Sequence, residues 1–140
     1  MVILDTDHMS LFERGNDDAL RLAARLDPLP PSDKATTIVT YEEQTRGWLA
    51  YLAKARTLDR QLDGYKKLRR HLAIYCQIQV LEFDQAAADE FQRLSGLRLG
   101  VGTMDRKMAA IVLAHDATLL SRNLRDFHKI DGLKVEDWTV

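Results

Sequence analysis

The chain has 140 residues, of which 46% are hydrophobic and 29% are charged. This length and composition indicate one globular domain of ordinary size, residues 1–140, and exclude a disordered chain. The net charge of −1 gives no general attraction to nucleic acid or to an anionic membrane.

The chain carries one cysteine, Cys76, so it has no internal disulfide. Its neighbours Ile74, Tyr75 and Ile78 are apolar, and we expect a buried, unreactive thiol. The first residues lack the pattern of a secretory signal, and no apolar run has the length of a membrane span. We therefore expect a cytoplasmic protein with no membrane contact.

Short apolar runs alternate with longer amphipathic stretches along the chain. The runs expected to form strands are Val2–Leu4, 35–40, 78–81, 118–121 and 133–135. The stretches expected to form helices are 8–12, 17–26, 41–55, 58–75, 84–94 and 103–115, with a turn or short helix over 123–127. This alternation indicates an α/β fold, in which a short parallel sheet has helices on both faces. The stretches 41–55 and 58–75 predict a helical hairpin inserted between two strands.

Acidic residues follow a predicted strand or begin a predicted helix at four places in the chain. They are Asp5 with Asp7, Glu43 with Glu42, Asp105, and Asp126 with Asn123. The ends of parallel strands meet at one edge of a sheet, so the fold can collect these side chains in one cleft. Crowded carboxylates repel one another unless a cation neutralises them, and Mg²⁺ and Mn²⁺ prefer oxygen ligands. The pattern predicts a divalent-metal site that activates water for attack on a phosphodiester.

Each acid also suits a purely structural role. Asp7 could cap the short helix that follows it, and Asp105 could stabilise the dipole of a helix capped by Thr103. Glu42 and Glu43 both lie near a helix start, and their positions alone do not choose between them. Asn123 with Asp126 reads as a capping arrangement.

Four motifs together resemble PIN-domain nucleases, and in particular VapC-type toxins of type II toxin–antitoxin systems. The opening Leu4-Asp5-Thr6-Asp7 is similar to that family's start, where Asn is usual in place of Asp7. Residues 40–47 are similar to its second motif, whose spacing to Gly47 selects Glu43 over Glu42. Residues 105–110 resemble the third motif, 118–127 the last one, and 133–138 the usual ending.

The resemblance implies a PIN-like three-layer sandwich and an endoribonuclease that uses one or two Mg²⁺ or Mn²⁺ ions. By motif, Asp5, Glu43 and Asp105 would be the catalytic, metal-binding acids, and Asn123 or Asp126 would fill a fourth position. The residues that would support these ligands are Thr6, Asp7 and Ser121.

The family also implies a cognate antitoxin protein that neutralises the toxin. A homodimer is usual, and a higher-order toxin–antitoxin complex is compatible with it. DNA would be contacted only through the antitoxin.

RNA needs basic side chains near the acids, and the candidates are Arg106, Lys107, Arg122 and Arg125. The predicted hairpin is rich in lysine and arginine as well, either to contact phosphates or as a solvated face. It could also form a groove for a helix of the antitoxin. Its aromatic residues Trp48, Tyr51 and Tyr65 are expected to pack between the two helices, with base stacking as the alternative.

Two other functions fit parts of the pattern. Asp5 and Asp7 form an Asp-x-Asp pair after a strand, as in haloacid-dehalogenase-like phosphatases, where they would be nucleophile and general acid. Met9 lies where that family prefers Thr or Val. A PIN-like module that binds RNA or protein without catalysis is the other alternative, and retention of all three main acids argues against it.

Overall fold

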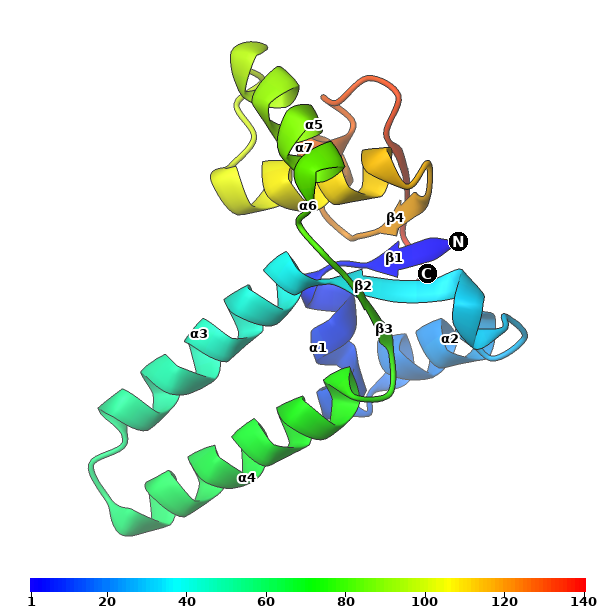
Figure 1. Ribbon diagram of the computed structural model, residues 1–140. Coiled ribbons are helices and arrows are strands. Elements are labelled where there is room, and N and C mark those ends of the chain that lie inside the picture. The colour runs from blue at the N-terminus through cyan, green and yellow to red at the C-terminus, as the bar shows by residue number, and fades with distance from the viewer.

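A five-stranded parallel sheet forms the centre of the molecule (Figure 1). The computed structural model describes residues 1–140. The strands are β1 Val2–Leu4, β2 Lys34–Thr37, β3 Gln79–Leu81, β4 Thr118–Leu120 and β5 Lys134–Glu136. Their order is β3-β2-β1-β4-β5, and every neighbouring pair is parallel. The predicted α/β fold is confirmed.

The helices cover both faces of this sheet. They are α1 Thr6–Arg14, α2 Asp17–Leu26, α3 Ile38–Lys54, α4 Leu58–Tyr75, α5 Gln85–Gly96, α6 Thr103–Ala114 and α7 Leu124–Phe127, with a 3₁₀ turn η1 at Pro31–Asp33. Figure 1 shows α5 and α6 on one side of the sheet and α1 and α2 on the other. No helix combines the length and the apolar surface that a membrane span requires.

The alternation of side chains along β1 divides the core into two layers. Ile3 faces the cluster that contains residues of α5 and α6, whereas Val2 and Leu4 face the cluster built on α1 and α2. Ile3 and Leu4 are both fully buried. A strand buried on both faces explains why the sequence at this point is an uninterrupted apolar run. The predicted three-layer sandwich is confirmed.

The α3–α4 hairpin is confirmed and extends away from the sheet (Figure 1). Its helices approach closely at Gly64, where an added Cβ would lie 2.6 Å from a methyl carbon of Leu52. Tyr65 is 61% exposed, so the expectation that it packs between the helices is wrong. Trp48 and Tyr51 are half-buried and contact each other edge to face.

The second strand is shorter than the sequence predicts. Residues 35–40 are rich in β-branched side chains, but β2 ends at Thr37 and α3 begins at Ile38. The Thr37 hydroxyl accepts a hydrogen bond from the Thr40 backbone N–H at 3.0 Å and caps the helix. This capping bond overrides the weak strand preference of the two residues after Thr37.

Two further local predictions are wrong. Cys76 is exposed, because it follows the last residue of α4 at the helix end and its side chain is not covered by the apolar neighbours that the sequence places beside it. Gly102, not Thr103, occupies the N-cap of α6, and Thr103 is the first residue of the helix. Asn16 caps α2 and Asp84 caps α5, since both side chains accept a backbone N–H bond from the first turn.

Candidate metal and active site

Asp5 lies at the junction where β1 ends and α1 begins. Its Oδ1 accepts the backbone N–H of His8 at 2.8 Å, so Asp5 is the N-cap of α1. Its backbone N–H donates to Leu120 of the neighbouring strand β4 at 3.1 Å. The residue is only 7% exposed. The sheet and the helix together therefore hold this carboxylate in a fixed place at the carboxyl end of β1.

Asp7 is not the cap that the sequence suggested as its structural role, because the carboxylate of Asp5 already occupies that position. Asp7 lies in the first turn of α1, and its Oδ2 accepts from Nε of Arg122 at 2.5 Å. The same guanidinium donates from Nη1 to Asp18 of α2 at 2.9 Å. Arg122 thus ties the end of β4 to both helices.

Glu43 reaches the same place from α3. The Thr6 hydroxyl donates to its Oε1 at 3.1 Å. Burial raises the pKa of Glu43; the Thr6 hydrogen bond opposes this, and the charges of Asp105 and Asp5 add to it. Glu42 instead pairs with Arg46 one helical turn away, at 2.5 Å. The structure therefore separates the two glutamates by what they contact.

Asp105 belongs to the first turn of α6 and is half-buried. Burial raises its pKa, and the negative charges of Asp5 and Asp126 raise it further. Asp5, Glu43 and Asp105 therefore lie in one electrostatic neighbourhood, although they come from three separate elements.

The chemistry of this donor set fits a hydrated divalent cation. The donors are carboxylate oxygens, which suit Mg²⁺ and Mn²⁺. No three Asp, Glu, His or Cys side chains converge closely enough to enclose an ion by themselves. Mg²⁺ usually binds through one or two carboxylates and keeps several waters, so an open arrangement of this kind matches its preference. A cation here would also relieve the repulsion that adds to the effect of burial on the pKa values of Glu43 and Asp105.

The fourth predicted position holds two linked side chains. Asn123 precedes α7 but does not cap it; its Nδ2 donates instead to Oδ2 of Asp126 at 3.1 Å. This bond and Lys129, whose Nζ lies 3.3 Å from Oδ1, lower the pKa of Asp126. Ser121 is fully buried, and its Oγ accepts the backbone N–H of Asn123 at 2.9 Å. Asp126 is thus the charged member of the pair, and its negative charge contributes to the raised pKa of Asp105.

The basic residues predicted to bind RNA differ in how far other side chains already engage their charged groups. Arg106 stacks over Phe91, with 5.4 Å between its Cζ and the ring centroid, and its Nη2 donates to Thr103. Lys107 lies 5.9 Å from the Phe91 ring centroid. Arg122 is engaged by two aspartates, as described above. Arg125 is exposed and forms no ion pair, so it is the basic group most available to a phosphate.

Two features of this region were missed by the sequence analysis. His8 is fully buried, and its ring Nδ1 lies 3.2 Å from Oδ1 of Asp5. A histidine three residues after a capping aspartate is a spacing that could have pointed to this contact.

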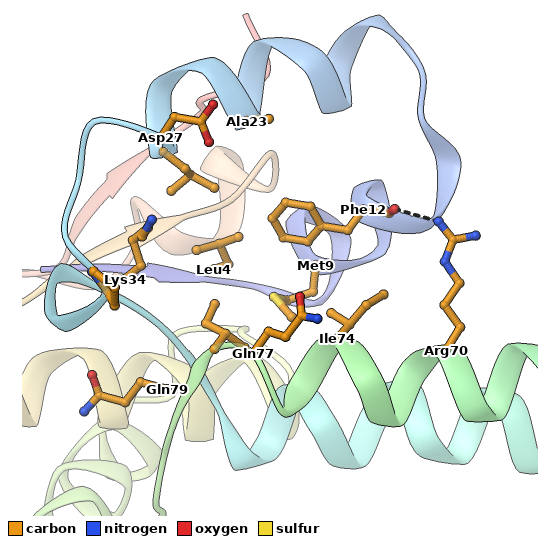
Figure 2. Close-up of a pocket in the computed structure, with 13 residues that line it drawn as sticks. Leu4, Met9, Phe12, Ala23, Asp27, Lys34, Arg70, Ile74, Gln77 and Gln79 are labelled. Atoms are coloured by element: carbon orange, nitrogen blue, oxygen red, sulfur yellow. Dashed lines mark hydrogen bonds between the residues drawn. The ribbon is translucent and has the colours of Figure 1, made fainter.

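The second missed feature is an apolar groove of about 460 Å³ between α1, α2 and α4 (Figure 2). Leu4, Met9, Phe12 and Ile74 line it, and Arg70 crosses one end by donating to the backbone oxygen of Phe12 at 3.1 Å. The groove brings together residues far apart in sequence, which no local pattern reveals.

The fold and the arrangement of acids define a class of nuclease domain. The PIN domain family model matches residues 2–133, and the chain belongs to the PIN domain family. The family predicted from the four motifs is confirmed. No curated protein sequence matches the chain.

Solved structures of VapBC and FitAcB proteins share this fold. VapBC-1 from nontypeable Haemophilus influenzae is 20% identical with a TM-score of 0.77, over 100% of both chains. FitAcB from Neisseria gonorrhoeae is 23% identical with a TM-score of 0.72, over 99% of this chain and 98% of that one. DNA-bound VapBC from Salmonella typhimurium is 22% identical with a TM-score of 0.72, over 98% of this chain and 97% of that one. The predicted likeness to VapC-type proteins is confirmed.

Proposed function

We propose that this chain, as a single PIN-like domain over residues 1–140, is a metal-dependent endoribonuclease and the toxin of a toxin–antitoxin pair. The observation that carries the proposal is the shared electrostatic neighbourhood of three carboxylates, Asp5, Glu43 and Asp105, in which the charge of Asp5 adds to the raised pKa of both Glu43 and Asp105. Membership of the PIN domain family supports a nuclease.

The three acids would hold Mg²⁺ or Mn²⁺, one or two ions per site. When bound, the ion lowers the pKa of a water and neutralises charge on the phosphate. Thr6 orients Glu43 through its hydroxyl, and the α1 cap fixes Asp5. Asp126, whose carboxylate accepts a hydrogen bond from Asn123, adds negative charge near Asp105.

Basic side chains around the acids would attract the RNA backbone. Arg125 is exposed and forms no ion pair. Arg106 and Lys107 lie on the same helix as Asp105, and both contact the ring of Phe91 on α5. Arg122 would contribute through its remaining donors or by exchanging an aspartate for a phosphate. Such an enzyme would act in the cytoplasm, on single-stranded regions of RNA.

The antitoxin would be a separate protein that binds this chain. VapBC proteins, to which this fold is similar, form a family of toxin–antitoxin systems, and the Salmonella typhimurium VapBC named above is bound to DNA. The apolar groove of Figure 2 has the lining that suits the apolar face of a partner helix. A homodimer and a larger toxin–antitoxin complex fit the same picture, with DNA bound only by the antitoxin.

A catalytically silent PIN-like binding module is the second candidate. A titration that shows no binding of Mg²⁺ or Mn²⁺ would favour it, because no three side chains enclose an ion by themselves. The phosphatase alternative finds less support, because Asp7, its required general acid, forms an ion pair with Arg122. Such a pairing suits a carboxylate and not a proton donor.

The test is cleavage of RNA by purified protein with Mg²⁺ or Mn²⁺ and with a chelator. Glu43→Gln and its neighbour Glu42→Gln form a matched pair, because only Glu43 contacts the site. We expect chelation to stop cleavage and Glu43→Gln to reduce it by about 100-fold or more, with Glu42→Gln close to the wild type. Cleavage that survives chelation, or equal activity of the two variants, would contradict the proposal.

A further inference from the structure

His8 is a fully buried histidine directly behind Asp5. It belongs to α1, and its backbone N–H makes the capping bond to Asp5 Oδ1 at 2.8 Å. Its ring adds a second contact, with Nδ1 3.2 Å from the same oxygen. On the other side of the ring, Nε2 accepts the backbone N–H of Trp138 at 3.4 Å.

These contacts fix the position of the ring proton. A nitrogen that accepts a hydrogen bond presents its lone pair, so in the neutral imidazole the proton is on the other nitrogen. Nε2 accepts from Trp138, and Nδ1 therefore carries the proton and donates it to Asp5 Oδ1. The Asp137 carboxylate lies 3.8 Å from Nε2, which is too long for a hydrogen bond that would compete.

These contacts restrict the orientation of the Asp5 carboxylate. Oδ1 receives two N–H donors from His8, one from the backbone and one from the ring. No group of the protein donates to Oδ2. A carboxylate held in this way cannot rotate freely, and it presents a single oxygen to anything that binds in front of it.

The segment after β5 holds the donor that sets this tautomer. Thr139 is 2% exposed, and its N–H and hydroxyl donate to Asp137 Oδ1 at 2.9 and 2.6 Å. Arg21 of α2 donates from Nε to the Thr139 backbone oxygen at 2.5 Å. The Arg25 guanidinium stacks 4.5 Å from the Trp138 ring centroid. The end of the chain is therefore anchored on α2 with the Trp138 N–H aimed at His8.

We propose that His8 is a positioning residue that, held by the Trp138 backbone N–H, orients Asp5 so that Oδ2 alone faces the metal ion. This inference rests on the proposed metal site. It adds a role for a residue that touches neither the ion nor the RNA, and it makes residues 137–139 part of the support of the site. Groups that orient a metal ligand in this way typically change metal affinity 10- to 100-fold when removed.

The first measurement needs no variant. A ¹⁵N–¹H correlation spectrum of the imidazole rings in the wild-type protein distinguishes a protonated from an unprotonated ring nitrogen. We expect His8 to be protonated at Nδ1 and unprotonated at Nε2, with or without Mg²⁺. A proton on Nε2 would overturn the inference, because Nδ1 could then not donate to Asp5.

The second measurement is a Mn²⁺ titration that follows free Mn²⁺ by electron paramagnetic resonance. His8→Leu removes the ring donor, and His8→Asn restores one, since its amide nitrogen takes the place of Nδ1. His71→Leu is the matched control, because His71 is also a buried histidine, 1% exposed, but its ring bonds Thr45 and not an acid. We expect Mn²⁺ to bind His8→Leu at least ~10-fold more weakly than the wild type. His8→Asn and His71→Leu should stay within ~3-fold of the wild type on the same scale.

The outcomes separate the inference from the proposed function. Wild-type binding with equal affinity in His8→Leu overturns the positioning role and leaves the metal site standing. A wild type that binds no Mn²⁺ overturns both. If His8→Leu does not fold, Trp138→Pro and Trp138→Ala replace it, because only the proline variant also removes the N–H donor. Weaker Mn²⁺ binding by Trp138→Pro than by Trp138→Ala supports the inference, and equal binding overturns it.

Discussion

Replacing Asp5 by alanine removes a helix cap as well as a charge. The lost cap costs about 1 kcal/mol of stability. The ring N–H of His8, fully buried, loses its only acceptor, which costs about 1–3 kcal/mol more. Asp5→Asn keeps an acceptor oxygen for both bonds and removes the same negative charge. The two variants therefore lose the same electrostatic repulsion and differ by the capping oxygen.

We expect the free energy of unfolding of Asp5→Ala to be about 2–4 kcal/mol lower than that of Asp5→Asn. For a chain of this size, about 4 °C in Tm corresponds to 1 kcal/mol, so the difference is about 8–16 °C. Thermal unfolding followed by circular dichroism in a chelator measures it. Neither variant should bind Mn²⁺ as the wild type does. Melting temperatures that agree within about 2 °C would refute the capping argument and, with it, the description of how Asp5 is held.

Three other predictions concern stability and exposure. Glu43→Gln should stabilise the metal-free protein at pH 7 by about 0.5–2 kcal/mol, because it removes a charge that burial disfavours. Since the folded-state pKa of Glu43 is raised, this side chain lowers stability above its unfolded pKa. The penalty disappears as the pH falls through the raised pKa, so the advantage of the variant over the wild type should vanish in acid; urea titrations at several pH values test this. Gly47→Ala should stabilise α3 by about 1 kcal/mol, whereas Gly64→Ala, which meets Leu52, should be about 1–3 kcal/mol less favourable than that control; a gain in Gly64→Ala equal to that in Gly47→Ala would contradict the close approach. The exposed thiol of Cys76 should react with a disulfide reagent in the native state, and a thiol that reacts only in denaturant would show that it is buried.

Local signals in the sequence were sufficient for most of the fold. The uninterrupted run Val2–Leu4 predicted a strand, and the apolar spacing over Leu58–Tyr75 matched α4 to the residue. Asn16 and Asp84 each place a short polar side chain directly before an amphipathic stretch, and each caps the helix that follows. Each of these features depends on neighbours within a few residues.

The errors arose where a local preference was overruled or left without a partner. Residues 38–40 favour a strand by side-chain type, yet the Thr37 cap commits them to a helix. Tyr65 follows the apolar stripe of α4, but the hairpin leaves that part of the stripe in solvent. Periodicity predicts which face is apolar and does not say what covers it.

In the candidate site, too, local sequence signals predicted some features, and others depend on long-range contacts. Asp5, Glu43 and Asp105 were singled out by their positions after a predicted strand or near the start of a predicted helix, and by the resemblance of their motifs to the family. The role of Arg122 and the contact from Trp138 to His8 could not be predicted in this way, because the paired residues are separated by 115 residues for Arg122 with Asp7 and by 130 for Trp138 with His8. Such contacts follow from the sheet order, which places β4 beside β1 and β5 beside β4.

The central claim is that Asp5, Glu43 and Asp105 hold a divalent ion. The most direct measurement is anomalous diffraction from crystals soaked in Mn²⁺. We expect an anomalous peak among these three carboxylates, within bonding distance of Asp5 Oδ2 and not of Oδ1. A crystal that takes up Mn²⁺ elsewhere while this position stays empty, or a peak bound through Oδ1, would contradict it.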